Sequence, residues 1–473
     1  MNIVCADLGA SNGRVFVGSF DGQRLTLSEM HRFHHASVAL FGHLYWDMMH
    51  LYKETAAGLG IASRQFGAPR SIGIDGWSQD FGLLDKQGNL LTVPHSYRDS
   101  RTDNMADIVY AGMSEHELFR ITGKPPSQVT TLFQLAAMRR TEQAALDHAD
   151  KLLFIPNLLG YYLTGELNCD SSLASASSLM DIRQRDWSAP IAQAYGLGTL
   201  MPAISRPGRI VGETMAHVRE AGGTPGIPVV SVAQHDTISA LLAADLAARS
   251  DAGDAATIVC GTWSVVSVTH DVPIFDDFML KHGFHNEPAY YGDEVHVLKY
   301  MTGMWILQEC MKEWSAGGAH WDYERLQAGA QLSRYDSPID VESEEFSQPG
   351  EMREKIVRYC RRTGLPEPQN EIEIFQCIML GLANKFAETV SQLEQLTGRR
   401  LDKIVMVGGG SRSEYLCRLT ARLSGLPVYA GMHEASIVGN SIAQLVALGE
   451  IGHFKEATDL LDRSFKTVIF PFN

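Results

Sequence analysis

The sequence IVCADLGASNGR at residues 3–14 decides the fold, because its pattern returns later in the chain as IVCGTWS at residues 258–264. Each copy is followed by a second run of mostly β-branched residues, at 15–17 and at 265–268. Two apolar runs joined by a turn of glycine and a hydroxyl residue predict a β-hairpin. Glycine lets backbone N–H groups come close to an anion. The repetition therefore predicts two related domains that hold a nucleotide between them.

Size and composition agree with two domains of a globular protein. The chain has 473 residues, of which 45% are hydrophobic and 20% charged, and a chain of this length exceeds what one core usually supports. The net charge of −15 argues against a nucleic-acid surface, which needs a basic face. No apolar run approaches the roughly 20 residues that span a bilayer. We expect neither nucleic acid nor membrane as a partner, and a monomer or a homodimer.

The cysteines and the first residues predict a cytoplasmic protein. Seven cysteines are scattered along the chain without a C-x-x-C spacing, and two of them, Cys5 and Cys260, fall in predicted buried strands. Isolated thiols in an odd number fit a reducing compartment better than a disulfide framework. The chain opens on a predicted strand, and no signal-peptide pattern precedes it.

Predicted strands alternate with predicted helices in both halves, which is typical of the α/β class. A helix is expected over 48–64 with Asp47 as its N-cap, and a hairpin over 83–91. The small polar stretch 249–256 is the best linker candidate, because the second copy of the opening pattern follows it directly. We therefore expect one domain at 1–248 and another at 249–473.

Two short segments carry candidate chemical groups. Asp7 stands at a strand end beside a glycine turn, where a carboxylate can hold hydrated Mg²⁺ while Ser11, the turn amides and Arg14 meet phosphate oxygens. Asp236, in His235-Asp236-Thr237, follows a buried strand and could accept the proton of an attacking hydroxyl. The alternatives are that Asp7 only caps its turn, and that Asp236 or Thr237 only caps a helix.

Glycine-containing turns recur in the second half. Gly261-Thr262 can present an amide and a hydroxyl to a phosphate, and 408–411 (Gly-Gly-Gly-Ser) follows a predicted strand and precedes a helix. The chain has no G-x-x-x-x-G-K-[ST] sequence, so a nucleotide site would be of another type.

A further group of residues could bind a sugar. Asp75, Trp77 and Asp80 follow a predicted strand, where the acids can bond hydroxyls and the indole can stack on a sugar ring; a capped turn with a core tryptophan is the alternative. His31, His34 and His35 are interpreted as surface histidines, because no acidic or cysteine partner is spaced with them as in a metal site.

Taken in order, these segments resemble the FGGY carbohydrate kinases of the sugar-kinase/actin-like superfamily, and within that family the rhamnulokinase branch most closely. The matching stretches are collinear over nearly the whole chain: 7–14, 31–33, 72–75 with Trp77 and 80–81, 97–101, 163–165, 235–237, 261–264, 297–299, Trp305 with 307–308, 407–410, and 434–436 with 439–440.

The resemblance implies two ribonuclease-H-like domains of the actin-like ATPase superfamily around a central cleft, with sugar on the N-terminal and ATP on the C-terminal side. It implies Mg²⁺- and ATP-dependent phosphorylation of a ketose at a terminal hydroxyl, with Asp236 as general base. It assigns to the nucleotide and metal Asp7, Ala10, Ser11, Asn12, Gly13, Arg14, Gly261, Thr262, Gln308, Gly409 and Gly410, with Asp7 toward the metal. It assigns to the sugar Trp77, Ser78, Asp80, His235, Asp236, Thr237 and Tyr300.

Two positions depart from the rhamnulokinase pattern. Ser78 replaces a glycine after the tryptophan, and Tyr300 replaces an asparagine after Leu-Lys. Both would lie in the sugar pocket, where one changed polar partner can shift discrimination by orders of magnitude. L-Rhamnulose, L-fuculose and a shorter ketose (a tetrulose or pentulose) therefore stay open, as do a polyol kinase and a non-catalytic sugar- or nucleotide-binding regulator on the same fold.

Overall fold

The computed structural model describes residues 1–473 except 199, 250–252, 319, 453 and 473. Its contacts divide the chain into two compact units. The first contains 1–243, 270–297 and 436–464, and the second contains 244–269, 298–435 and 465–473. Neither unit is continuous in sequence. The expected linker 249–256 lies partly outside the described residues.

The first unit is built on a sheet with the strand order β11-β12-β6-β1-β2-β3. Its strands and helices are β1 (Asn2–Leu8), β2 (Asn12–Phe20), β3 (Leu25–His34), β4 (Val38–Leu40), β5 (His43–Tyr45), α1 (Met48–Phe66), β6 (Ile72–Gly76), β7 (Phe81–Leu84), α2 (Ala106–Gly112), α3 (Glu115–Thr122), α4 (Thr131–Thr141), α5 (Gln143–His148), β8 (Lys151–Phe154), α6 (Ile155–Thr164), α7 (Ser171–Ala176), β9 (Met180–Asp181), β10 (Asp186–Trp187), α8 (Ala189–Ala194), β11 (Arg209–Glu213), β12 (Pro228–Ser231), α10 (Asp277–His282), β15 (Phe284–Pro288), α16 (Ala435–Ala447) and α17 (Phe454–Ser464).

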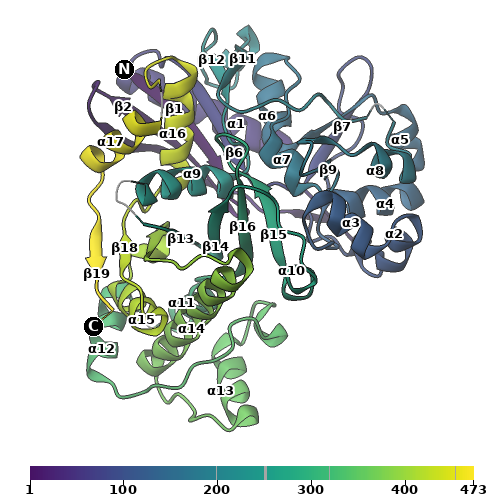
Figure 1. Ribbon diagram of the computed structural model, residues 1–473. Coiled ribbons are helices and arrows are strands. Elements are labelled where there is room, and N and C mark those ends of the chain that lie inside the picture. The colour runs from purple at the N-terminus through teal and green to yellow at the C-terminus, as the bar shows by residue number, and fades with distance from the viewer. Residues whose placement is uncertain (199, 250–252, 319, 453, 473) are drawn as a thin grey trace. The chain divides into compact units, whose positions relative to one another are not determined.

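The alternation of side chains along β1 explains how helices cover both faces of this sheet. Val4, Ala6 and Leu8 point to one face and pack in a core with residues of α1 and α6. Cys5 points to the opposite face and packs with Ile437 of α16; Figure 1 shows α16, in yellow, beside β1. Asp7 shares the face of Cys5, so the turn after β1 presents its carboxylate on the α16 side.

The second unit has its own sheet, in which β16, β14, β13, β17, β18 and β19 follow one another. Four elements, α9, β14, β16 and α16, run from one unit into the other. The elements are α9 (Asp236–Ala248), β13 (Ala255–Cys260), β14 (Trp263–His270), β16 (Val295–Thr302), α11 (Trp305–Ala316), α12 (Tyr323–Leu332), α13 (Met352–Thr363), α14 (Glu371–Thr397), β17 (Lys403–Val407), α15 (Glu414–Ser424), β18 (Val428–Ala430) and β19 (Val468–Phe470). Short 3₁₀ helices lie at Ser100–Thr102, Ala216–Arg219, Glu344–Phe346 and Gly409–Arg412.

The two repeated sequences form the same motif in the two units. β1 pairs antiparallel with β2 and parallel with β6, while β13 pairs antiparallel with β14 and parallel with β17. In each case the glycine-containing turn of the hairpin stands where its first strand and the adjoining parallel strand end. The repeat seen in the sequence is thus a repeat of topology, and the α/β class with two sheet-containing domains is confirmed.

Local expectations were met, with one hairpin shorter than expected. The helix expected over 48–64 is α1, and Asp47 caps it by accepting the N–H of His50 at 3.0 Å. The hairpin expected over 83–91 is short: Leu84 forms an antiparallel bridge with Leu90, and Leu91 N–H donates to Leu83 O at 2.9 Å. The main partner of β7 is β8, more than 60 residues away, which the sequence did not predict. Pairing with β8 buries the side chains of Leu83 and Leu84 more completely than a short exposed hairpin would. The seven cysteines are buried and without disulfide bonds.

No helix in the described part of the chain is both long and apolar enough to cross a membrane.

Candidate active site

Three carboxylates stand where neighbouring strands of the first unit end. Asp7 in β1 lies opposite Asp75 in β6, and β6 runs parallel with both β1 and β12. Asp236 follows β12, and the chain there is tied to the end of β6 because Gly76 N–H donates to Gln234 O at 2.9 Å. Open α/β sheets bind ligands at the carboxyl ends of their parallel strands. This edge of the sheet is therefore the candidate active site.

The expected phosphate turn, which includes Ala10, Ser11, Asn12, Gly13 and Arg14, is built around Asp7. Arg14 lies opposite Asp7 in the hairpin register, and its guanidinium forms an ion pair with Asp7 Oδ2. The hydroxyl of Ser436 in α16 donates to the same oxygen at 2.7 Å.

Gly13 is required here because a Cβ at that position would fall 2.0 Å from the ring of Phe33. A partly exposed turn of small residues beside a guanidinium is suited to phosphate oxygens.

Asp75 is completely buried, and Asp7 keeps only 2% of its surface exposed. Its Oδ2 accepts a hydrogen bond from Asn440 Nδ2 at 3.1 Å. Burial, with the negative charges of Asp7 and Asp236 nearby, raises the pKa of Asp75 well above its usual value. Asp75 therefore keeps its proton at pH values where an ordinary aspartate is ionised.

Asp236 begins α9 and keeps 28% of its side chain exposed. Burial of the remainder raises its pKa, the charge of His235 lowers it, and the charge of Asp7 raises it. His235 Nε2 lies 3.8 Å from Asp236 Oδ1, and the hydroxyl of Thr237 donates to the same oxygen at 3.2 Å. A carboxylate with a raised pKa and one accessible side is suited to accept a proton. The structure thus brings His235, Asp236 and Thr237 together with Asp7.

Trp77 and Asp80 take part in a buried polar cluster. Asp80 Oδ2 accepts the indole N–H of Trp46 at 2.6 Å and that of Trp77 at 3.0 Å, while Asp80 Oδ1 accepts Gln134 Nε2 at 2.9 Å. Asp80 is fully buried, and burial raises its pKa to about 6 although these hydrogen bonds oppose the shift. Asp80 therefore fixes the orientation of Trp77. Ser78, which follows Trp77 in the sequence, is also buried.

The histidines near β3 differ from the surface group expected. His31 Nε2 lies 2.6 Å from Glu54 Oε2, so an acidic partner exists that the spacing did not show. His35 is buried, and its ring stacks on that of Trp77 with centroids 5.3 Å apart. Strand alternation alone could not predict this burial, because the covering residue, Trp77, comes from the segment that follows β6. His34 is exposed, as expected.

The second unit brings its predicted groups together at an equivalent turn. The hydroxyl of Thr262 donates to Gln308 Oε1 at 3.1 Å. The N–H of Gly303 donates to Thr262 O at 3.1 Å, and that of Met304 donates to Gly261 O at 2.8 Å. The 261–262 turn is therefore held by the start of α11, the helix that carries Gln308.

The glycines after β17 lie beside the same hairpin. A Cβ at Gly410 would fall 2.2 Å from Cys260 Sγ, whereas a Cβ at Gly409 would meet no atom within 4 Å. Gly410 thus permits close packing of the turn on β13, and Gly409 faces open space. Tyr300, expected to contact the sugar, lies half-buried in β16 in the second unit.

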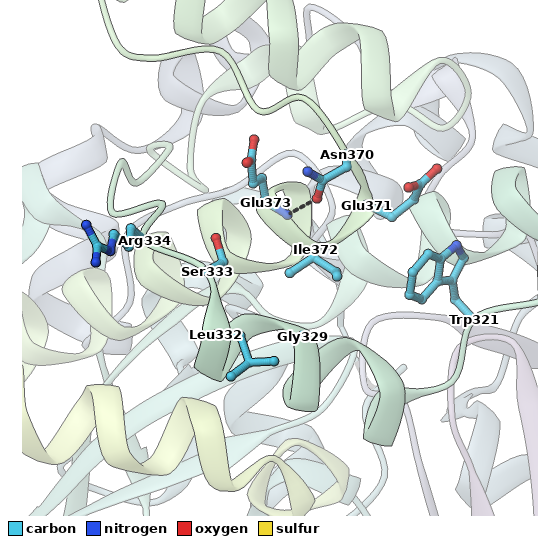
Figure 2. Close-up of a pocket in the computed structure, with 9 residues that line it drawn as sticks. All are labelled: Trp321, Gly329, Leu332, Ser333, Arg334, Asn370, Glu371, Ile372 and Glu373. Carbon is cyan, nitrogen blue, oxygen red and sulfur yellow. Dashed lines mark hydrogen bonds between the residues drawn. The ribbon is translucent and has the colours of Figure 1, made fainter.

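A surface pocket of about 490 Å³ lies elsewhere in the second unit, between the end of α12 and the start of α14. Figure 2 shows Ile372, Leu332 and Trp321 around it, and Asn370 accepting the N–H of Glu373 at 3.0 Å. None of the residues expected to bind nucleotide or sugar lines this pocket.

Comparison with protein families agrees with this arrangement. Residues 2–243 match the N-terminal domain and residues 256–448 the C-terminal domain of the FGGY family of carbohydrate kinases. The chain belongs to the FGGY family of carbohydrate kinases. As a member of that family it is an ATP-dependent sugar kinase.

Curated relatives extend over nearly the whole chain. A rhamnulokinase of Bacteroides thetaiotaomicron is 34% identical over 464 residues, covering 98% of this chain and 94% of that protein. A rhamnulokinase of Bacillus subtilis is 31% identical over 466 residues, again covering 98% of this chain and 94% of that protein. The kinase is therefore rhamnulokinase-like.

Solved structures share the fold. A xylulose kinase from Rhodospirillum rubrum superposes with a TM-score of 0.79 at 17% identity, covering 100% of this chain and 94% of that one. A Plasmodium falciparum glycerol kinase with ADP gives a TM-score of 0.78 at 15% identity, covering 99% of this chain and 94% of that one. These FGGY kinase neighbours confirm the actin-like ATPase fold expected from the sequence.

Sequence reasoning gave some residues of the site no role, although 434–436 and 439–440 are among the stretches that resemble the family. Ser436 and Asn440 of α16 bind Asp7 and Asp75, and Gln444, one turn further, donates to Val4 O at 2.8 Å. A signal existed, because these polar residues recur every fourth position in an otherwise apolar helix. The pattern indicates a buried polar stripe but not the strands that it meets.

Proposed function

We propose that the kinase transfers the γ-phosphate of ATP to the terminal hydroxyl of a ketose, with Asp236 as general base. The observation that carries the proposal is the position of Asp236: it is partly exposed and begins α9, just after a bridge between His235 and the end of β6, at the same edge of the sheet as Asp7. In the reaction, the hydroxyl oxygen forms a bond to the γ-phosphorus, the bond to the leaving ADP oxygen breaks, and the hydroxyl proton passes to Asp236. A carboxylate whose pKa is raised is a stronger base for this step.

The neighbouring groups would orient the two reactants. Arg14 and the turn from Ala10 to Gly13 would bind phosphate oxygens, whose negative charge the guanidinium offsets. His235 and Thr237 flank the base and would contact the sugar, together with Trp77 and Ser78. Asp80 would act through Trp77, since its own oxygens already accept three N–H groups.

We assign nucleotide binding to the segment 249–473 and sugar binding to 1–248. Thr262 and Gln308, joined by a hydrogen bond, would bind the nucleotide with Gly261, Gly409 and Gly410. The open space at Gly409 supports this role, because a ligand can approach the backbone there.

The magnesium ion is assigned to Asp7. Within the described residues, no group of three or more His, Cys, Asp or Glu side chains could hold a metal ion. A single carboxylate, that of Asp7, fits Mg²⁺, because this ion usually keeps several waters and binds one or two carboxylates together with substrate phosphates. When bound, the ion would neutralise phosphate charge; Asp7 would orient it, and Ser436 and Arg14 would hold Asp7 in place.

L-Rhamnulose, converted to L-rhamnulose 1-phosphate, is the first substrate to test, because the curated relatives are rhamnulokinases. Ser78 and Tyr300 make L-fuculose or a tetrulose or pentulose the second candidate. Ser78 is buried, and its hydroxyl accepts Gln79 Nε2 at 3.2 Å, so it adds a polar atom where the rhamnulokinase pattern has none. A coupled assay of ADP release over L-rhamnulose, L-fuculose, xyluloses, ribuloses and erythrulose decides between them.

The Asp236→Asn variant tests the chemistry. It should fold and bind ATP normally but lose ~10²- to 10⁴-fold in kcat, the usual contribution of a general base. Asp277→Asn is the matched control, because Asp277 is an exposed aspartate in the first turn of α10. An Asp236→Asn enzyme with most of its kcat intact would exclude Asp236 as the base.

A further inference from the structure

A buried chain of charged and polar groups runs from the base into the first unit. His235 Nδ1 lies 3.6 Å from Glu287 Oε2, and Glu287 Oε1 accepts a hydrogen bond from Lys124 Nζ at 2.6 Å. Glu287 is fully buried and Lys124 is 4% exposed. The groups that face one another here are Asp236 from α9, Glu287 and His285 from β15, and Lys124 from the loop after α3.

Burying a lysine and a glutamate costs several kcal/mol per ion unless geometry and partners compensate. Alone, burial would raise the pKa of Glu287, but the charge of Lys124 and the hydrogen bonds from His235 and Lys124 bring it well below its usual range. Glu287 is therefore an anion inside the protein. An ion pair this costly at this place calls for a role beyond stability, because an apolar pair of the same volume would serve stability as well.

The backbone around the pair is fixed on both sides. Asn286 N–H donates to Gly123 O at 2.8 Å, and Thr122 Oγ1 accepts the N–H of Lys124 at 3.2 Å. Gly123 ends α3 in the left-handed conformation with φ of 70°, which turns the chain so that Lys124 meets β15. Both partners of the ion pair are thus placed by main-chain hydrogen bonds.

The backbone of His235 is held as well, by a residue of α7. Its N–H donates to Ser172 Oγ at 3.0 Å, and Ser172 Oγ donates to Asp170 Oδ2 at 2.5 Å. With the main chain anchored, the orientation of the imidazole depends on what its ring nitrogens meet. Glu287 faces Nδ1, and Nε2 faces Asp236.

We propose that Lys124 and Glu287 are positioning residues, which fix the imidazole of His235 with Nδ1 toward Glu287 and Nε2 toward Asp236 and the sugar hydroxyl. Glu287 accepts the Nδ1 proton, and Lys124 holds the Glu287 carboxylate in the orientation that does so. The proposal rests on the proposed function, in which Asp236 is the base. Neither residue belongs to the segments that the family resemblance assigned to sugar or nucleotide.

The test compares Glu287→Gln, Lys124→Met, Lys124→Arg and the double variant Lys124→Met/Glu287→Gln under steady-state conditions. Misplacing a catalytic group by about 1 Å can cost ~10²-fold, so we expect the first two variants to lose ~10- to 100-fold in kcat while the KM for ATP stays within ~2-fold. Lys124→Arg, which keeps the charge, should recover most of kcat. Lys385→Met is the control, because Lys385 also pairs with a glutamate, Glu388 at 3.1 Å, but its side chain is 18% exposed.

The double variant keeps the test decisive if Lys124→Met fails to fold. It removes both charges, so it should fold, and it should still show the loss of kcat because the imidazole is no longer held. A folded double variant with parental kcat would overturn the proposal. A rise in the ketose KM at unchanged kcat would also overturn it, because Lys124 would then bind the sugar directly. Failure of the proposed function is separate: it would appear as full activity of Asp236→Asn.

Discussion

Asp80 offers a sharp test of how burial governs ionisation near the site. Its carboxylate accepts N–H groups from Trp46, Trp77 and Gln134, yet burial still raises its pKa to about 6, from an ordinary value of 3.8. We consider the Asp80→Asn variant, which has the shape of the protonated acid and cannot ionise. The amide of Gln134 cannot rotate to match the new side chain, because rotation would break the hydrogen bond that Arg101 donates to Gln134 Oε1 at 2.8 Å.

The magnitude follows from linkage between protonation and folding. Because the folded chain holds this proton more tightly than the unfolded chain, the contribution to stability is fully present below about pH 4. It is lost as the pH rises through about 6. The interval between 3.8 and about 6 corresponds to ~3 kcal/mol, at ~1.4 kcal/mol for each pKa unit.

The assay is urea unfolding of both proteins at several pH values between 4 and 7. The two contact units need not unfold together, so the transition is followed by hydrogen exchange of a peptide that contains β6 and β7. The parent should lose ~3 kcal/mol relative to Asp80→Asn between pH 4 and pH 7. The variant has a constant offset from its lost acceptor, but that offset does not change with pH. A difference between the two proteins that stays constant from pH 4 to pH 7 would refute the raised pKa.

Two further predictions concern packing and charge at the same edge of the sheet. A Cβ at Gly439 in α16 would fall 1.8 Å from Ser239 O in α9, so Gly439→Ala should lower the free energy of unfolding by ~1–3 kcal/mol, measured in urea. Gly160→Ala in α6, where a Cβ meets nothing within 4 Å, is the matched control and should stabilise by ~0.5–1 kcal/mol; equal effects would contradict the packing argument. Asp75→Asn should raise the urea midpoint at pH 7 and leave it unchanged at pH 4, because a buried acid with a raised pKa costs stability only where its unfolded form ionises; a loss of stability at pH 7 would show that Asp75 is an anion.

Local patterns in the sequence predicted the elements that depend on local chemistry. The β1–β2 hairpin needs only β-branched residues and a glycine turn, and α1 needs only its apolar spacing and the cap at Asp47. The second hairpin, β13–β14, followed from the same rules. The position of Asp236 after a strand and before a helix was predicted, because that position is itself a local pattern.

Contacts between distant segments could not be predicted in this way. Lys124 and Glu287 are 163 positions apart, and no periodicity relates a loop after α3 to a strand such as β15. The pairing of β7 with β8 was missed for the same reason, since the apolar run at Leu83 and Leu84 fits a local hairpin as well as a distant strand.

The three carboxylates at the strand ends show why residue type alone does not assign a role. Asp7 is paired with the guanidinium of Arg14, so an opposite charge lies directly beside its carboxylate. Asp75 is buried against Asn440 with two negative neighbours, so it is protonated and adds no charge to the site. Asp236 keeps one accessible side and a raised pKa, which leaves it as the carboxylate able to accept a proton. Like groups can take different roles when their environments give them different protonation states. Here those environments are provided largely by α16 and by the charged and polar side chains from His235 to Glu287.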